Sequence, residues 1–198
     1  MSASMNEVSH PLGQITTTRP REICASILTG DQIAREEAMR PIAVAPSADS
    51  IHALPSADFG DAFAIDVQDS TLDAPAAARQ AFAGQPGWIG NLLTLRNMLV
   101  RPFGLKTGAD ARLPNSRRVG IFPLVSSTPE RVVLGFDDAH LNFRIVVHVK
   151  ALNETTRRVT ATTLVHRNNM LGRVYLASVM PFHKLIVPTM LARLGDVR

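Results

Sequence analysis

The stretch from Leu141 to Lys150 reads LNFRIVVHVK, and it decides the fold class of this chain. Its odd-numbered residues are all apolar, whereas its even-numbered residues are mostly polar. Successive side chains of a β-strand point to opposite faces, so this alternation predicts a strand with one buried face. Residues 118–125, 131–136 and 157–167 are strand-like in the same way. The gaps between these runs are short, which favours antiparallel hairpins.

Upstream of these strands, the sequence predicts one further strand and two helices. Residues 61–67 alternate with period two. Residues 71–83 contain Asp73 at a capping position and then a run of alanines, which is typical of a helix. Residues 88–100 place Trp88 and three leucines on one side of a second helix.

The chain ends in a long helical pattern over residues 169–194. Pro181 and Pro188 lie inside it and predict a kink or a break. One apolar stripe is expected to face the sheet, and its members are Leu171, Tyr175, Ser178, Phe182 and Ile186. The order of strand, two helices, antiparallel strands and one long helix is typical of an α+β protein. We expect a curved antiparallel sheet wrapped around the C-terminal helix, with a cavity between them.

The N-terminal part of the chain differs in character from the rest. Residues 32–39 favour a short helix that Asp31 would cap, after a polar arm. Residues 41–57 hold three prolines and predict an extended linker. The sequence therefore divides into residues 1–57, an N-terminal arm with short helices, and residues 58–198, one compact domain.

Composition bounds the class of protein. Hydrophobic residues make up 45% of the chain and charged residues 19%, which indicates a folded core rather than disorder. Cys24 is the only cysteine, so a disulfide framework and a thiolate metal cage are excluded. The first ten residues lack the apolar core of a signal peptide, and no long apolar run is free of charge. We therefore expect a cytoplasmic protein with no membrane span.

Charge is distributed unevenly along the chain. Residues 141–198 carry nine Lys and Arg against two Asp and Glu, a net charge of +7, whereas residues 1–140 carry a net charge of −3. A basic region could attract an anionic ligand, an acidic partner or nucleic acid. Aromatic residues do not interleave with these cations, as single-strand binding requires. We expect the cations to cover the outer side of sheet and helix, and nucleic acid is not an expected partner.

The sequence Asp137-Asp138-Ala139-His140 supports two interpretations. Carboxylates beside a histidine could relay protons or bind a metal, but the spacing matches no standard motif, and we expect no metal or cofactor. A turn with local hydrogen bonds is the simpler interpretation. Arg144 has the parity of His140 on the strand, so the two could grip a carboxylate or phosphate in a cavity. Alternatively both face outward, toward solvent or a partner subunit, or Arg144 pairs with Asp138.

Further candidates lie around the last helix. An anion could bind at the helix N-terminus beside Arg173, although Asn168 or Asn169 could instead cap this end. His183 could hydrogen-bond a carbonyl that Pro181 frees, or lie at the mouth of the cavity. The candidate ligand-binding residues are Asp138, His140, Arg144, His166, Arg173, Tyr175, Phe182 and His183.

Three blocks in the second half resemble a known family. They are residues 135–144 (GFDDAHLNFR), 166–176 (HRNNMLGRVYL) and 181–183 (PFH), accompanied upstream by Trp88 and Arg96-Asn97. Together they resemble a bacterial family described only as a domain of unknown function, number two-eight-six-seven, over residues 58–194. In its element order that family is similar to the START-like, or SRPBCC, helix-grip superfamily.

The resemblance implies a helix-grip fold, in which a curved antiparallel sheet wraps around the long C-terminal helix. Members of the wider superfamily commonly hold lipids, polyketides or other apolar molecules in a cavity, and some are cyclases or hydroxylase subunits. Fold by itself does not imply function. The resemblance therefore implies a class of ligand without a reaction.

No catalytic signature is present among the nucleophile-elbow, phosphate-loop and dinucleotide motifs. A Ser-His-Asp triad stays open, because triads assemble across the chain. The first hypothesis is a protein that binds a small apolar or amphipathic, lipophilic ligand. The second is an interaction protein with a packed interior, which meets a partner or forms a homodimer. The third is a cyclase or isomerase that moves protons with Asp138, His140 or His183.

Overall fold

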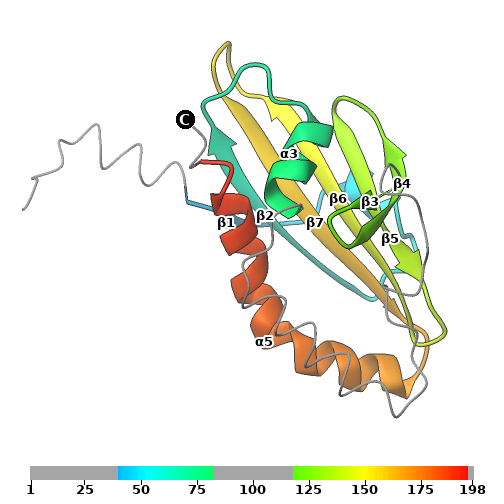
Figure 1. Ribbon diagram of the computed structural model, residues 1–198. Helices are drawn as coiled ribbons and strands as arrows, with labels where there is room; N and C mark the ends of the chain where they lie inside the picture. Colours follow the sequence, from blue (N-terminus) through cyan, green and yellow to red (C-terminus); the bar gives the residue numbers. More distant parts are fainter. Residues whose placement is uncertain (1–39, 83–117, 196–198) are drawn as a thin grey trace, which may run out of the picture.

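The alternating stretch that begins at Leu141 forms strand β6 (Leu141–Ala151) in a seven-stranded antiparallel sheet. The computed structural model describes residues 40–82 and 118–195, and Figure 1 shows its twisted sheet. The strand order is β1-β2-β7-β6-β5-β4-β3. The other strands are β1 (Ile42–Val44), β2 (Phe59–Val67), β3 (Arg118–Val119), β4 (Phe122–Ser127), β5 (Arg131–Asp137) and β7 (Arg157–Arg167). The predicted α+β class and the antiparallel hairpins are confirmed.

β6 and β7 form the long central hairpin of the sheet. They pair from Leu141 opposite Arg167 to Ala151 opposite Arg157. This register sets odd-numbered residues opposite odd-numbered residues, so the apolar side chains of both strands share one face. β2 pairs with the other side of β7, although the two strands lie far apart in the sequence.

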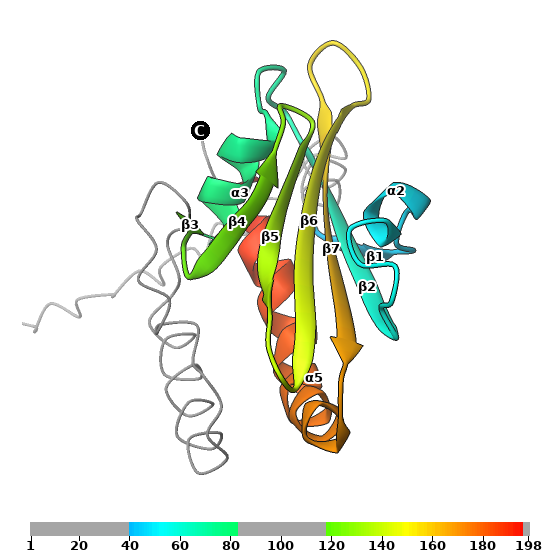
Figure 2. The ribbon, with the colours of Figure 1, turned by 90° about the vertical axis from the view of Figure 1, so that its right-hand side faces the viewer.

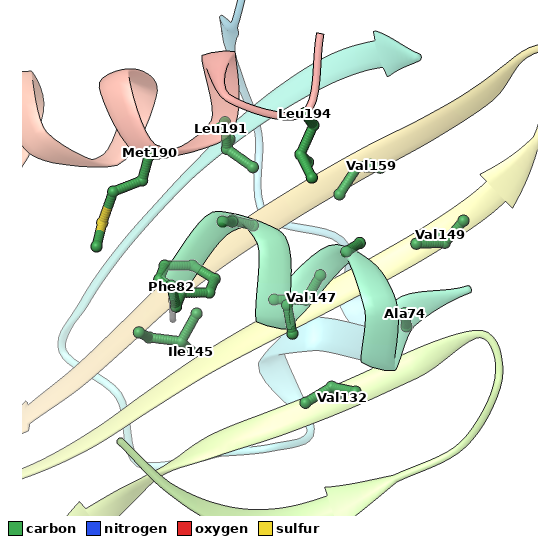
Figure 3. Close-up of a cluster of buried hydrophobic side chains, with 14 of the residues drawn as sticks. Ala74, Phe82, Val132, Ile145, Val147, Val149, Val159, Met190, Leu191 and Leu194 are labelled. Carbon is green, nitrogen blue, oxygen red and sulfur yellow. The ribbon is translucent and has the colours of Figure 1, made fainter. Parts of the chain in front are cut away.

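Two helices, α3 (Ala74–Phe82) and α5 (Met170–Ala192), cover the apolar face (Figures 1 and 2). α3 begins as predicted, because the Asp73 carboxylate accepts a hydrogen bond of 2.7 Å from the Ala76 N–H. The alanines of α3 are buried against the sheet, where small side chains allow the helix to lie close. Figure 3 shows Phe82 of α3 beside Ile145 and Val147 of β6 in the main core.

α5 is one continuous helix, so the prediction of a break is wrong. Pro181 and Pro188 lie inside it, and Figure 1 shows the helix bending along its length. A proline removes one helical hydrogen bond and bends a helix without ending it when the flanking turns are held. Here the sheet holds them, because the buried residues of α5 lie near its two ends. They are Gly172, Leu176, Val187, Met190 and Leu191.

The predicted stripe of α5 is displaced from the buried one. Ser178 and Phe182 were expected to face the sheet, but both are exposed. The buried stripe runs through Leu176 and Val187, each one residue after a member of the predicted stripe. α5 is apolar on most of its circumference, so helical periodicity does not distinguish the side that packs against the sheet.

The opposite face of the sheet is covered in part by α2 (Ala48–Ile51) and the turn after it. Leu54 packs there with Val133, Val146 and Leu164 in a second core cluster. The prediction of an extended linker over residues 41–57 is therefore wrong. β1 pairs with β2, and α2 lies on the sheet. Its three prolines flank these short elements without interrupting them.

The strand predicted over residues 118–125 is two strands, β3 and β4. They are joined by Gly120 and Ile121, and Gly120 has φ of 60°, which suits glycine at the first position of a two-residue turn. The helices predicted over residues 32–39 and 88–100 lie outside the described residues.

Candidate functional site

The structure distributes the eight predicted site residues over four places. Asp138, His140 and Tyr175 meet where the β5–β6 turn contacts the start of α5. Arg144 and His166 lie on the face of the sheet opposite α5, and Arg173 and Phe182 lie on the outer side of α5. From the middle of α5, His183 reaches toward the sheet, where it meets Asp61. The eight residues therefore do not lie together in one place.

The β5–β6 turn is built as a turn. Asp138 Oδ1 accepts a hydrogen bond of 2.6 Å from the Ala139 N–H, and the Asp138 N–H donates to the Leu141 carbonyl. His140 is 1% exposed, and its Nδ1 lies 3.4 Å from Asp138 Oδ2. Its ring meets Tyr175 edge to face at 5.6 Å. These contacts agree with the turn interpretation and seal His140 from solvent.

Two asparagines fasten this turn to α5. Asn168 Nδ2 donates to the Asp138 carbonyl at 2.8 Å, and Asn169 Nδ2 donates to the Ala139 carbonyl at 3.1 Å. Asn169 Oδ1 also accepts from the Gly172 N–H at 3.1 Å, which confirms the predicted capping role. The first turn of α5 is therefore engaged by the chain itself rather than left open for an anion.

Arg144 is held by its own hairpin. Its guanidinium makes a forked ion pair with Asp137, at 2.9 and 3.0 Å, and also donates to the carbonyls of Phe136 and Phe143. The alternative in which Arg144 pairs with Asp138 is therefore wrong, because the neighbouring Asp137 is the partner. His140 does not accompany Arg144, because it lies in the turn, where strand parity no longer applies, and its ring packs on α5.

His166, Arg173 and Phe182 lie outside the interior. Arg173 and Phe182 are exposed on α5. His166 lies opposite Asn142 in the sheet, and its Nδ1 is buried with no hydrogen-bond partner among the described residues. Contacts of these three residues with a ligand stay a prediction.

Asp61 and His183 form a hydrogen-bonded pair between β2 and α5, here called the interior pair. His183 Nε2 lies 2.9 Å from Asp61 Oδ2 and 3.0 Å from Oδ1. Since an ionised carboxylate only accepts hydrogen bonds, Nε2 carries the proton and donates it. Asp61 shares its strand face with Phe63 and Ile65, so an acid on the apolar side of β2 was the sequence signal for it.

The interior pair lies between two apolar clusters. One contains Leu141, Val165 and Leu176, and the main core contains Val187 and Leu191. Between them, α5 has no buried residue from position 177 to 186. The side chains of Asp61 and His183 are 21% and 14% exposed. The sheet and α5 are thus closely packed at both ends of the helix, and a polar pair that solvent still reaches lies in the middle.

A second polar cluster fastens α2 to the opposite face. His148 Nδ1 lies 3.3 Å from Ser50 Oγ, and His148 Nε2 lies 2.7 Å from Asp49 Oδ2. Burial acts to raise the pKa of Asp49, but the hydrogen bond to His148 and the charge of Arg131 hold this pKa below its usual value of 3.8. The sequence places His148 on the polar side of its strand, but it gives no sign of the serine and the aspartate that join it.

Ser50 contacts His148, and His148 contacts Asp49, as in the triad of a hydrolase. The geometry of this cluster nevertheless does not suit catalysis. Ser50 is fully buried, and its oxygen also contacts the hydroxyls of Ser47 and Thr162, at 2.9 and 3.2 Å. A nucleophile must reach a substrate carbonyl, and a sealed serine cannot. This cluster therefore stabilises α2 on the sheet. Within residues 40–82 and 118–195, no group of three or more His, Cys, Asp or Glu could hold a metal ion.

By length and composition, α5 alone among the described helices could cross a membrane. Only 17% of its most apolar 18-residue window is buried inside the protein. Leu176 and Leu191 nevertheless pack on the sheet, so the inner side of α5 belongs to the core. The structure therefore shows a sheet domain that carries one long apolar helix.

Comparison with known proteins gives a family without a function. Curated proteins include no match to this sequence. Among solved structures, the chain is similar to a conserved protein from Geobacillus kaustophilus, with 10% sequence identity and a TM-score of 0.35, over 69% of this chain and 92% of that chain. The family model described as protein of unknown function (DUF2867) matches residues 53–190. The chain therefore belongs to the DUF2867 family, as its sequence blocks predicted.

Proposed function

We propose that this protein is a helix-grip, START-like ligand carrier of the cytoplasm, which holds a small amphipathic molecule between the sheet and α5. The interior pair would be the polar contact of that molecule. The observation that carries the proposal is the position of the pair, since it lies between two apolar clusters in a stretch where α5 is not buried. Binding sites for small molecules commonly combine apolar walls with a few polar groups.

The chemistry of the pair indicates what the polar end of the ligand would be. Asp61 accepts the hydrogen bond of His183 Nε2, so the other ring nitrogen, Nδ1, is an acceptor when the imidazole is neutral. A ligand hydroxyl or amide N–H could donate to that nitrogen. Its apolar body would lie against Phe143 and Tyr175, which are partly buried at the neighbouring cluster. This combination favours an amphipathic molecule over a fully apolar one.

Retained ligand is the first test. Native mass spectrometry of freshly purified protein is expected to show extra mass that disappears when the protein is denatured. A thermal-shift panel of fatty acids, sterols and aromatic polyketides should then contain compounds that raise the melting temperature. A bare chain mass together with no shift across the panel would contradict the proposal and favour a packed interior.

Variants of the interior pair test the assignment of the site. We expect His183→Ala and Asp61→Asn to weaken binding of a panel hit by about five- to 150-fold, because a buried polar group left without its hydrogen-bond partner costs about 1–3 kcal/mol. Lys184→Gln is the matched control, since this neighbouring side chain is exposed on α5. Equal affinity in all three variants would exclude the pair from the site.

The enzyme hypothesis keeps only one of its three candidate residues, His183. It required two of Asp138, His140 and His183 to point into the interior, and Asp138 and His140 instead build the β5–β6 turn. A histidine oriented by an aspartate is still the arrangement of a general base. We therefore propose proton abstraction by His183 as the second function, to be tested by turnover of any retained ligand.

A further inference from the structure

The outer side of α5 is an exposed apolar surface. Met170, Val174, Phe182 and Leu185, here called the outer stripe, are 68%, 61%, 44% and 61% exposed. They recur at helical spacing on the side opposite Leu176, which packs on the sheet. Figure 1 shows α5 at the border of the described fold. Large exposed apolar surfaces usually mark contact with a partner or a membrane.

The hydroxyls on the same side of α5 are directed back to the helix. Ser178 Oγ donates to the Val174 carbonyl at 2.8 Å, and Thr189 Oγ1 donates to the Leu185 carbonyl at 2.7 Å. Each hydroxyl therefore satisfies its donor within α5 and presents mainly carbon to the outside. This arrangement lowers the cost of placing the surface in an environment without water.

The charges of α5 indicate which environment that is. The helix contains no Asp or Glu, and its two cations, Arg173 and Lys184, are exposed along one edge of the outer stripe. A second copy of the chain would bring these cations together with no acid on either helix to pair them. An apolar stripe edged by cations is instead the pattern of a helix that lies in the interface of an anionic membrane.

We propose that α5 docks the protein flat on an anionic lipid surface, with the outer stripe among the acyl chains and Arg173 and Lys184 at the headgroups. The helix does not cross the bilayer, because Leu176 and Leu191 keep its inner side on the sheet. The docking side is opposite the side that carries His183, so this proposal stands independently of ligand binding.

The test is flotation of the full chain with vesicles of phosphatidylcholine alone or mixed with phosphatidylglycerol. We expect binding to the mixed vesicles only, and at least about tenfold weaker binding in 0.5 M salt. The double variant Val174→Asp with Leu185→Asp should lose at least about tenfold in affinity. Arg173→Gln with Lys184→Gln should lose about fivefold for each cation, because each cation near an anionic surface contributes about that factor.

Leu152→Asp is the matched control, because Leu152 is 46% exposed but lies between β6 and β7, away from α5. It should bind as the unaltered chain does. Equal binding to both vesicle types, no binding, or the same loss in the control would overturn the proposal. If the protein is a dimer that the outer-stripe variants dissociate, the stripe is a protein interface instead.

Maleimide labelling tests whether the chain itself covers the outer stripe. In a Cys24→Ser background, Val174→Cys would then resist maleimide while the control Leu152→Cys reacts.

Discussion

At Gly172, the backbone of α5 approaches the β5–β6 turn closely. A Cβ atom built at this position would collide with the carbonyl oxygen of His140. The same carbonyl accepts the Asn168 N–H at 3.0 Å, so it cannot move without losing that bond. Glycine is therefore required here by close backbone approach rather than by its backbone dihedral angles.

Gly172→Ala is expected to destabilise the protein, although alanine is the better helix former. Helix propensity alone predicts a gain of about 1 kcal/mol, whereas the collision predicts a loss of about 1–3 kcal/mol. Urea unfolding followed by circular dichroism decides between the two signs. Gly60→Ala is the control, because its Cβ would meet only the flexible end of Leu164, at 3.2 Å, and should cost less.

The interior pair shows why residue-level prediction of the site was partial. His183 was identified as a candidate because a lone histidine beside a proline is visible in the sequence. Asp61 was not, since its partner lies on another element, and an acid that shares the parity of the apolar residues of a strand gives no sign of the group that pairs with it. Asp138 and His140 were chosen because they are adjacent polar residues, yet adjacency in sequence favours a turn over a site.

At the scale of elements, hydrogen bonds and ion pairs to the sheet stabilise α2, which is too short to be stable alone. A helix of four residues has little stability of its own. Ser47 caps it, Ser50 contacts His148, and Asp49 pairs with both His148 and Arg131. Stability of this element should consequently depend on the ionisation of Asp49.

The pH dependence of stability has a definite sign. Because the pKa of Asp49 is lower in the folded protein than its usual 3.8, its contribution is fully present above that value and is lost as pH falls through the folded pKa. We expect Asp49→Asn to be less stable than the unaltered chain at pH 5 to 7. The difference should shrink steadily below pH 4. Guanidinium unfolding of both proteins across this range measures it, and a constant difference at all pH values would contradict it.

α5 shows what element-level patterns can and cannot predict. Its existence, its start at residues 169–170 and its cap were predicted, because Asn169 and a long apolar run are local signals. The sequence left open whether Pro181 and Pro188 bend or break α5, because the contacts at both of its ends decide between the two. Its packed side was misassigned, since α5 has apolar residues all round.

For the whole molecule, the predicted division after residue 57 has an energetic test. β1 and α2 precede that point, and Leu54 is buried with Val133 and Val146. A chain that begins at residue 58 should melt about 3–12 °C below one that begins at residue 40. Burial of one leucine contributes about 1.5–3 kcal/mol, and each kcal/mol shifts the melting temperature of a chain of this size by about 2–4 °C. Equal melting temperatures in differential scanning calorimetry would instead support a boundary at residue 57.

The sequence by itself determined the sheet, the hairpins, the capped helices and the family of this protein. Strand alternation, turn residues and capping residues act over a few positions, and they keep the same meaning in any surroundings. Only the tertiary structure decided that residues 41–57 join the sheet, which side of α5 is buried, and that Asp61 meets His183. Each of these depends on residues distant in the chain, and such contacts follow from the packing of the whole core rather than from any local pattern.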